Sequence, residues 1–268
     1  MTDRKSIFIT GGASGIGRAV AVFFAGKGWF VGLADINEAG LAETAAMLPA
    51  GQSSLHRLDV RDRADWDRAL AAFWQAAGER MDVLFNNAGV GRGGALAETA
   101  MDDDELVVDV NIKGVLYGAK AGFPYLSQTP GSCLLNTASA AGIFGVAGMS
   151  VYCASKFAVR GLTESLDSEW AEHGIKVRSL MPSFVDTPIL DSISLDSNRK
   201  TRDIVLEAGM EISPVSMVAD AAWAAIHGKA VHTRVGKTAH RSWFLARWAP
   251  SLLAKRGKSM RASAGETR

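Results

Sequence analysis

The chain runs through Thr10-Gly11-Gly12-Ala13-Ser14-Gly15-Ile16-Gly17 between two apolar segments. The segment before it, Ile7-Phe8-Ile9, predicts a buried strand, and the segment after it, Ala19-Val20-Ala21-Val22-Phe23-Phe24, predicts a buried helix. Glycines let the backbone approach a pyrophosphate, and the N-terminus of the helix offers free N–H groups and positive potential. A strand, a glycine turn and a helix in this order predict a dinucleotide-binding site, with a plain tight turn as the alternative.

Strands and helices alternate along the rest of the chain. The pattern predicts strands at residues 5–10, 30–34, 54–58, 82–85, 132–138, 175–180 and 231–235. It predicts helices at residues 15–27, 38–47, 62–77, 103–125, 151–173 and 217–227. Such alternation indicates the α/β class, with a Rossmann-type doubly wound parallel sheet of seven strands and helices on both faces. The crossover rule predicts the strand order 3-2-1-4-5-6 with the seventh appended, and ligands bind at the carboxyl ends of such strands.

Composition favours a soluble cytoplasmic protein with one large core. The chain has 268 residues, of which 48% are hydrophobic, and residues 1–268 are expected to form a single catalytic domain. We see no signal peptide, no apolar run near the ~18 residues of a membrane span, and no disulfide framework in two cysteines. The five histidines are scattered, which predicts no metal site. Nucleic acid is not an expected partner, because no reading motif accompanies the basic residues.

Tyr152 and Lys156 stand four residues apart, and Ser139 lies thirteen residues before the tyrosine. Side chains at positions i and i+4 of a helix share one face, so the phenol and the ammonium can face one substrate. A phenol has a pKa of about 10, which a nearby ammonium lowers. The three residues predict an acid/base site that converts an alcohol to a ketone or the reverse. Taken alone, the Tyr–Lys pair would more often be a surface pair on a helix.

The glycine turn and the Tyr-x-x-x-Lys pair, in this order, resemble the short-chain dehydrogenase/reductase family over roughly residues 5–235. Further matches follow the family's order: Asn86-Asn87-Ala88-Gly89, Asn111, Leu134-Leu135-Asn136-Thr137-Ala138-Ser139 and Met181-Pro182-Ser183-Phe184-Val185-Asp186-Thr187-Pro188. Ser183 departs from the family, which most often has glycine after the proline. We expect this serine to restrict the backbone slightly near the nicotinamide.

The resemblance implies a catalytic set of Asn111, Ser139, Tyr152 and Lys156. In that set Tyr152 is the general acid/base, and Lys156 lowers its pKa and binds the nicotinamide ribose. Ser139 orients the substrate oxygen and stabilises alkoxide charge. Asn111 interrupts its helix and holds a water that links Lys156 to solvent.

The resemblance also implies which residues bind the cofactor. Asp59 and Val60 would contact the adenine, and Thr187 would reach the nicotinamide carboxamide. The full expected set is Gly11, Ser14, Gly15, Ile16, Gly17, Asp35, Ile36, Asp59, Val60, Asn87, Ala88, Gly89, Tyr152, Lys156, Pro182, Val185 and Thr187.

The charge around Asp35 predicts NAD rather than NADP. Asp35 ends a predicted strand about twenty residues beyond the glycine turn, where a carboxylate accepts hydrogen bonds from ribose hydroxyls and repels a 2′-phosphate. Neither Ile36 nor Asn37 is basic, and the turn has no basic residue before Gly15. NADP-preferring relatives generally place a cation at one of those positions. The alternative is that Asp35 is only a turn residue after a strand.

The substrate is less well specified by the sequence. Residues 189–214 are expected to form a lid, and the candidate pocket walls are residues 90–95, residues 141–146, Phe184, Ile189 and Leu190. Most of these residues are apolar, which favours a hydrophobic secondary alcohol or ketone. Arg92 is the one cation among them and could meet a substrate carboxylate or lie solvated on its loop.

Residues 236–268 form a basic amphipathic C-terminal extension. They hold eight Lys or Arg and one acid, Glu266, which leaves 21 basic and 27 acidic residues in the rest of the chain. Trp243, Phe244, Trp248, Leu252 and Leu253 recur at helical spacing. The favoured interpretation is a helix that packs on the catalytic domain or a neighbouring subunit, and the alternative is a helix that lies on a membrane or a partner.

The favoured function is an NAD-dependent oxidoreductase of a hydrophobic secondary alcohol or ketone. The alternatives are a reductase of a keto group on an acyl or steroid-like substrate, and a non-catalytic dinucleotide-binding protein of the same fold. The resemblance implies a homodimer through the helices at 103–125 and 151–173, with a homotetramer as the alternative. Four apolar residues of the second helix would need cover: Phe157, Val159, Leu162 and Leu166.

Overall fold

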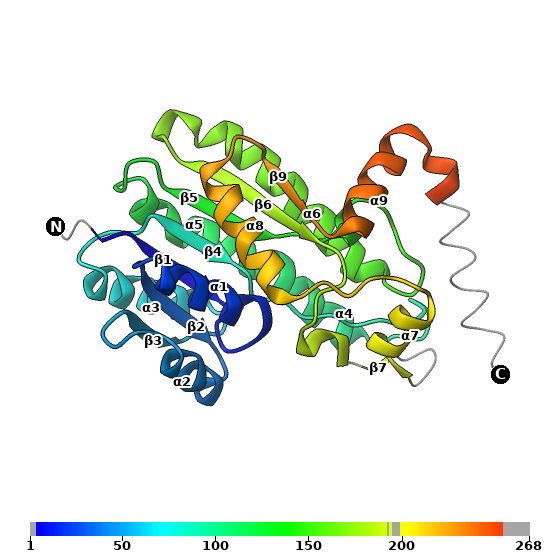
Figure 1. Cartoon of the computed structure of the whole chain (residues 1–268), viewed down its shortest axis with the longest axis horizontal. Helices are drawn as coiled ribbons and strands as arrows, with labels where there is room; N and C mark the ends of the chain where they lie inside the picture. The colour runs from blue at the N-terminus through cyan, green and yellow to red at the C-terminus, as the bar shows by residue number, and fades with distance from the viewer. Residues whose placement is uncertain (1–3, 192, 195–198, 254–268) are drawn as a thin grey trace.

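A computed structural model describes residues 4–191, 193–194 and 199–253. Its centre is a parallel sheet of seven strands in the order β3-β2-β1-β4-β5-β6-β9, which confirms the predicted fold and strand order (Figure 1). The strands are β1 Ser6–Thr10, β2 Phe30–Asp35, β3 Ser53–Arg57, β4 Val83–Asn86, β5 Cys133–Thr137, β6 Lys176–Pro182 and β9 His232–Val235. Their ends differ by one or two residues from the prediction, because fraying ladder ends carry little sequence signal.

Helices cover both faces of the sheet. They are α1 Gly15–Gly26, α2 Glu38–Ala46, α3 Arg63–Ala76, α4 Met101–Val108, α5 Gly114–Leu126, α6 Ser150–Glu169, α8 Val215–His227 and α9 Lys237–Trp248. Strand β1 shows why two layers form: Ile7 and Ile9 pack with α1 and α8 on one face, while Phe8 packs with α3 on the other. Alternate residues of a strand point to opposite faces, so a continuous apolar run serves both layers.

The predicted helix at 103–125 is two helices in the structure. A π-helix, Asp109–Lys113, joins α4 to α5 and confirms that the chain departs from regular helix around Asn111. The predicted lid also has more structure than expected, with a small hairpin of β7 Ile193–Ser194 and β8 Arg199–Lys200 followed by α7 Thr201–Glu207. None of the described helices is long and apolar enough to cross a membrane.

The outer face of α6 needs less cover than the sequence suggests. Val159 and Leu166 are buried within the protein, and Leu162 packs partly against its core. Phe157 alone of the four is exposed, at 41%. The expectation that all four need a partner subunit is therefore wrong for Val159 and Leu166, because a long helix can turn apolar residues toward its own sheet.

His56 on β3 is a buried histidine between aromatic rings. Its ring centroid lies 5.5 Å from that of Phe8 and 6.2 Å from that of Phe73, and its Nε2 is 2.8 Å from Ser54 Oγ. Burial lowers the pKa of His56 to about 4. The folded protein therefore keeps this ring neutral at a pH at which the unfolded chain would protonate it.

We expect His56→Gln to flatten the dependence of stability on pH. Between about pH 6.5 and pH 4 the unfolded wild type binds the extra proton, so its free energy of unfolding should fall as the pH falls, by up to about 3 kcal/mol. The variant lacks this contribution, so its slope over that range should be smaller. Urea unfolding at several pH values measures both slopes. His240→Gln, which removes an exposed histidine, should keep the slope of the wild type.

Candidate active site

The glycine turn lies at the carboxyl end of β1. Gly11 and Gly15 have φ values of +70° and +51°, in the left-handed region that glycine adopts without strain. A Cβ added at Gly17 would lie 2.1 Å from the carbonyl oxygen of Gly11, which is far too close. Ser14 precedes α1 in an extended conformation, and Ile16 packs onto the core. The turn can close at the start of α1 only because glycine occupies these positions.

Asp35 lies beside this turn at the end of β2. Its Oδ2 accepts a hydrogen bond from the Ala13 N–H at 3.2 Å, and its Oδ1 accepts one from the Asn37 N–H at 3.0 Å. The next side chain, Ile36, is 61% exposed. The carboxylate is thus oriented by main-chain donors beside the glycine turn, where it fits the expected role of binding ribose hydroxyls.

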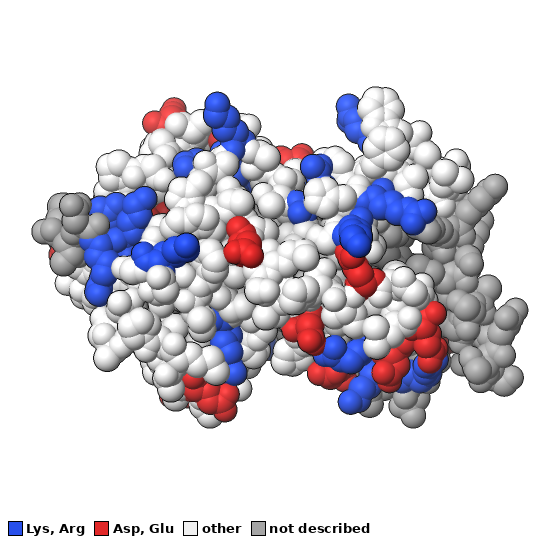
Figure 2. Space-filling model, in the orientation of Figure 1, with Lys and Arg blue, Asp and Glu red and all other residues white. Residues whose placement is uncertain are grey.

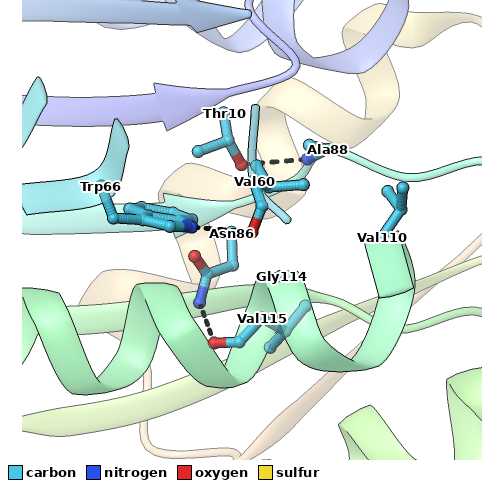
Figure 3. A pocket seen from close by; sticks show the side chains of 8 residues that line it. All are labelled: Thr10, Val60, Trp66, Asn86, Ala88, Val110, Gly114 and Val115. Carbon is cyan, nitrogen blue, oxygen red and sulfur yellow. Dashed lines mark hydrogen bonds between the residues drawn. The ribbon is translucent and has the colours of Figure 1, made fainter. Parts of the chain in front are cut away.

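The predicted adenine contacts at Asp59 and Val60 differ from each other. The carboxylate of Asp59 binds the Arg61 guanidinium at 2.9 and 2.6 Å, which lowers its pKa. The Val60 side chain is buried and lines a narrow gap beside Trp66 and Gly114, while its carbonyl accepts from Trp66 Nε1 at 3.0 Å (Figure 3). Val60 can therefore present little more than its main chain to a ligand.

Thr10 links the glycine turn to the Asn87-Ala88-Gly89 loop that follows β4. Its Oγ1 accepts hydrogen bonds from the N–H groups of Asn87 and Ala88, each at 3.0 Å (Figure 3 shows the second). The Asn87 Nδ2 donates to the Thr10 carbonyl at 3.0 Å. A Cβ added at Gly89 would lie 3.6 Å from Lys156 Nζ, so this loop passes close to Lys156.

Asn111 is fully buried in the π-helix. Its Oδ1 accepts from the Val90 N–H at 2.9 Å, and its Nδ2 donates to the Val90 carbonyl at 3.0 Å and to Ser155 Oγ at 3.2 Å. Ser155 in turn donates to the Tyr152 carbonyl at 2.7 Å. The side chain of Asn111 therefore fixes the loop after β4 against α6.

Ser139 and Tyr152 approach each other from different elements. Ser139 follows β5, and its Oγ accepts from the Ala141 N–H at 3.1 Å and donates to the Pro182 carbonyl at 3.4 Å. The Ser139 hydroxyl is close enough to Tyr152 to lower the pKa of the phenol, although burial outweighs this effect. That the serine shares a substrate oxygen with the phenol remains a prediction.

The Lys156 side chain is buried near Tyr152. Nζ donates to the Thr137 carbonyl at 3.0 Å and lies 5.6 Å from the centroid of the Tyr152 ring. Burial lowers the pKa of Lys156 to about 8 and raises the pKa of Tyr152. The second shift has the direction opposite to the expected one, because desolvation of the phenol outweighs the factors that favour its charged form.

The loop after β6 brings the predicted nicotinamide contacts to the glycine turn. Val185 is buried, and its carbonyl accepts from Thr187 Oγ1 at 3.3 Å. A Cβ added at Gly15 would lie 3.1 Å from the methyl group of Thr187. Ser183 Oγ is buried without a hydrogen-bond partner in the described part of the chain, and it faces Gly236, where a Cβ would lie 2.5 Å away.

Tertiary contacts tie the predicted lid to the loop after β6. The Ser213 N–H donates to the Phe184 carbonyl at 2.8 Å, and the Asp186 N–H donates to the Ser213 carbonyl at 2.9 Å. Glu211 accepts hydrogen bonds from the N–H groups of Lys237 and Thr238, at the start of α9. The rear of the lid, residues 210–214, is thus held by two different parts of the protein.

Two arginines near the expected pocket have acidic partners. Arg92 Nε lies 2.9 Å from Asp103 Oδ1. Arg202 on α7 contacts Asp186 at 2.8 Å, which joins the expected lid to the loop after β6, and Asp191 at 3.0 Å, which lies within the expected lid. Arg92 is therefore already neutralised, which weakens the case for a substrate carboxylate.

Three residues that the sequence did not single out hold the predicted site residues in place. They are Thr10, Thr137 and Ser155, which hold Asn87, Lys156 and Asn111 respectively. Thr10 stands immediately before the first glycine, so its place in the motif could have singled it out. Thr137 acts through its carbonyl, for which no residue type is a signal. Within the described residues, no group of three or more His, Cys, Asp or Glu could hold a metal ion.

Comparisons with known proteins agree with this geometry. A family model described as short chain dehydrogenase matches residues 5–198. The chain is 37% identical to the meso-2,3-butanediol dehydrogenase of Serratia marcescens over 185 residues, which cover 69% of this chain and 73% of that protein. It is 35% identical to a 3-oxoacyl-[acyl-carrier-protein] reductase of Thermotoga maritima, over 71% of this chain and 78% of that protein.

A solved structure matches this chain in fold and over nearly its whole length. It is a short chain dehydrogenase/reductase from Burkholderia phymatum in complex with NAD, with a TM-score of 0.82 and 31% identity. The match covers 95% of each chain.

Proposed function

This chain belongs to the short-chain dehydrogenase family of oxidoreductases, and we propose that it transfers a hydride between NAD and a hydrophobic secondary alcohol or ketone. The observation that carries the proposal is the convergence of Ser139, Tyr152, Lys156 and Asn111 at the carboxyl edge of the sheet. A protein that only bound a dinucleotide would have no use for a buried ammonium beside a phenol and a serine. The non-catalytic alternative is therefore disfavoured.

The residues present fit a nicotinamide dinucleotide. Side chains at Gly11 and Gly17 would fill the turn that the pyrophosphate would approach, and Thr187 reaches the same place from the loop after β6. When bound, the cofactor accepts or supplies the hydride, and its oxidised ring adds a positive charge that favours the phenolate.

The chain's own residues move the proton. In alcohol oxidation the Ser139 hydroxyl would hold the substrate oxygen, and Tyr152 would take the proton from the alcohol. Lys156, whose pKa is about 8, would bind the cofactor ribose and pass the proton toward solvent. The Asn111 side chain would hold the loop after β4 against α6 beside this proton route.

The case for NAD rests on Asp35 and on the acidic partners of the two arginines that lie nearest to it in the described part of the chain. Arg18, on the first turns of α1, donates through Nη2 to the Ala13 carbonyl at 2.5 Å and to Glu43 Oε2 at 2.8 Å. Arg57, opposite Asp35 on β3, lies near Glu38 and Asp65 at 3.6 and 3.7 Å. Both guanidinium groups therefore have acidic partners that would compete with a 2′-phosphate for them.

We expect Asp35→Ala to weaken NAD and to relieve the rejection of NADP. The loss of charge-assisted hydrogen bonds to the ribose should lower kcat/KM with NAD by about 10–100-fold. Removing the repulsion should raise kcat/KM with NADP. Steady-state kinetics with both cofactors measure the ratio, and Asp67→Ala, which removes an exposed carboxylate on α3, is the control. A wild type that prefers NADP would contradict the assignment.

The substrate class rests on the apolar walls of the expected pocket and on the neutralised Arg92. Phe144 and Phe184 are half-buried at its edge, and Ile189 is 43% exposed. A keto group on an acyl or steroid-like compound is the second candidate, which the acyl-carrier-protein reductase relative favours. A screen of NAD-linked oxidation across aliphatic, aryl, steroid and sugar alcohols tests the class. Turnover confined to sugars would contradict it.

Assembly and location complete the proposal. We propose a cytoplasmic homodimer through α5 and α6, with Phe157 at the contact, and a homotetramer as the alternative.

A further inference from the structure

The helix α9 has two faces, and the body of the protein covers one of them. Ala239 and Ser242 are buried. Trp243 lies against two guanidinium groups, with Arg160 at 4.7 Å and Arg234 at 5.2 Å from its ring centroid. Packing on the catalytic domain, which the sequence favoured, therefore accounts for this inner face.

The outer face carries cations and large apolar side chains. Lys237, Arg241, Phe244 and Trp248 follow at intervals of four, three and four residues, which is the spacing of one helix face. Phe244 is 61% exposed and Trp248 is 71% exposed. Leu252, beyond the end of the helix, is 52% exposed. In water this arrangement does not stabilise the fold, because exposed aromatic side chains leave apolar surface hydrated.

We propose that this outer face, made by Lys237, Arg241, Phe244, Trp248 and Leu252, docks reversibly onto an anionic phospholipid surface. Aromatic and aliphatic side chains flanked by Lys and Arg are the composition of a helix that lies in the headgroup region. Tryptophan is well suited to that boundary, because its ring is apolar and its N–H is polar.

The charge of the chain supports an anionic surface. Between Gly236 and Gly265 the sequence has no acidic residue, whereas residues 1–235 hold six more acidic than basic residues. The excess of positive over negative charge in the sequence is thus concentrated at this end of the chain. Figure 1 shows α9 at the end of the molecule far from β3, and Figure 2 shows blue Lys and Arg atoms among white ones over it.

A second copy of the chain suits this face less well. In a two-fold contact the same face meets itself, so a face with a net positive charge would meet another with the same charge. Lys237, Arg241 and Arg247 would all contribute to that repulsion. An anionic headgroup layer places opposite charge against the same side chains.

Docking at a lipid surface would matter for a hydrophobic substrate. This advantage, unlike the docking itself, rests on the proposed function. Trp243 and Ala246 of α9 pack in one cluster with Ala138 and Ile143, on either side of Ser139. Docking through α9 would therefore bring the substrate side of the protein near the lipid, where an apolar alcohol is concentrated.

Vesicle binding by the full chain tests the proposal without any measure of turnover. We expect cosedimentation with vesicles of roughly seven parts phosphatidylcholine to three parts phosphatidylglycerol, and at least tenfold weaker binding to phosphatidylcholine alone. Raising the salt from about 50 to about 500 mM should weaken binding about tenfold. Phe244→Ala combined with Trp248→Ala should weaken it at least tenfold at an unchanged thermal unfolding midpoint.

The control removes exposed apolar area elsewhere. Met47→Ala combined with Leu55→Ala changes side chains that are 55% and 47% exposed, and it should bind like the wild type. Brominated acyl chains should quench wild-type fluorescence, and Trp248→Phe should abolish that quenching. Equal binding of the α9 variant and the wild type would overturn the proposal. So would the absence of vesicle binding, and a changed oligomeric state of the variant in light scattering would then assign the face to a second copy.

Discussion

Tyr152→Phe should lower kcat by about 10³-fold and leave the dissociation constant for NAD within about twofold of the wild type. The change removes the hydroxyl that we propose exchanges the substrate proton, yet it keeps the ring that lies 5.6 Å from Lys156 Nζ. Because burial raises the pKa of Tyr152, the rate of alcohol oxidation by the wild type should rise with pH. The residual rate of the variant should lack that rise.

Stopped-flow measurement of the hydride step and titration with NAD separate the two effects. Tyr125→Phe makes the same change on α5, where the ring packs on Trp74 at 5.2 Å, and it should keep full activity. Substantial turnover by Tyr152→Phe at every pH would show that another group moves the proton.

Gly17→Ala should weaken NAD binding by about 100-fold or more. Its Cβ would lie 2.1 Å from the oxygen and 2.7 Å from the carbon of the Gly11 carbonyl, so the turn must open to admit it. A displacement of about 1 Å at a positioning element is enough for an effect of this size. Isothermal titration with NAD and with NADH measures the loss.

Gly26→Ala is the matched control, because it lies at the other end of α1 with nothing within 4 Å of its added Cβ. It should bind NAD like the wild type. Circular dichroism and thermal unfolding show whether Gly17→Ala still folds. Tight NAD binding by a folded Gly17→Ala protein would mean that the cofactor does not approach this turn.

The sequence predicted the sheet well, because its signals are local. Apolar runs such as Ile7-Phe8-Ile9 and glycines at the strand ends determine a parallel sheet almost by themselves, and the strand order followed from the crossover rule. Tyr152 and Ser139 were found because chemistry requires those residue types at that spacing.

What the sequence could not show depends on surroundings. The direction of the pKa shift of Tyr152 follows from desolvation, which no residue spacing reports. Whether Val159 faces a partner or its own sheet depends on the rotation of α6. Thr137 acts through a main-chain carbonyl, and Val60 turns its side chain inward. The hairpin and α7 in the lid were missed because short elements there are set by contacts such as that between Arg202 and Asp186. The predicted basic extension continues through residues 254–268, which lie outside the described part of the structure.

The attachment of Glu211 to the start of α9 has a mechanical consequence. A segment that is attached to the protein along one edge can move only by rotating about that edge. Residues 210–214 are fastened both to the loop after β6 and, through Glu211, to the amides of Lys237 and Thr238. If the lid opens, its pivot must therefore be this rear edge. The displacement would then be greatest around α7, which breaking the contact of Arg202 with Asp186 would release. Substitutions meant to widen the entrance to the expected pocket should therefore weaken the contacts of α7 and keep those of residues 210–214.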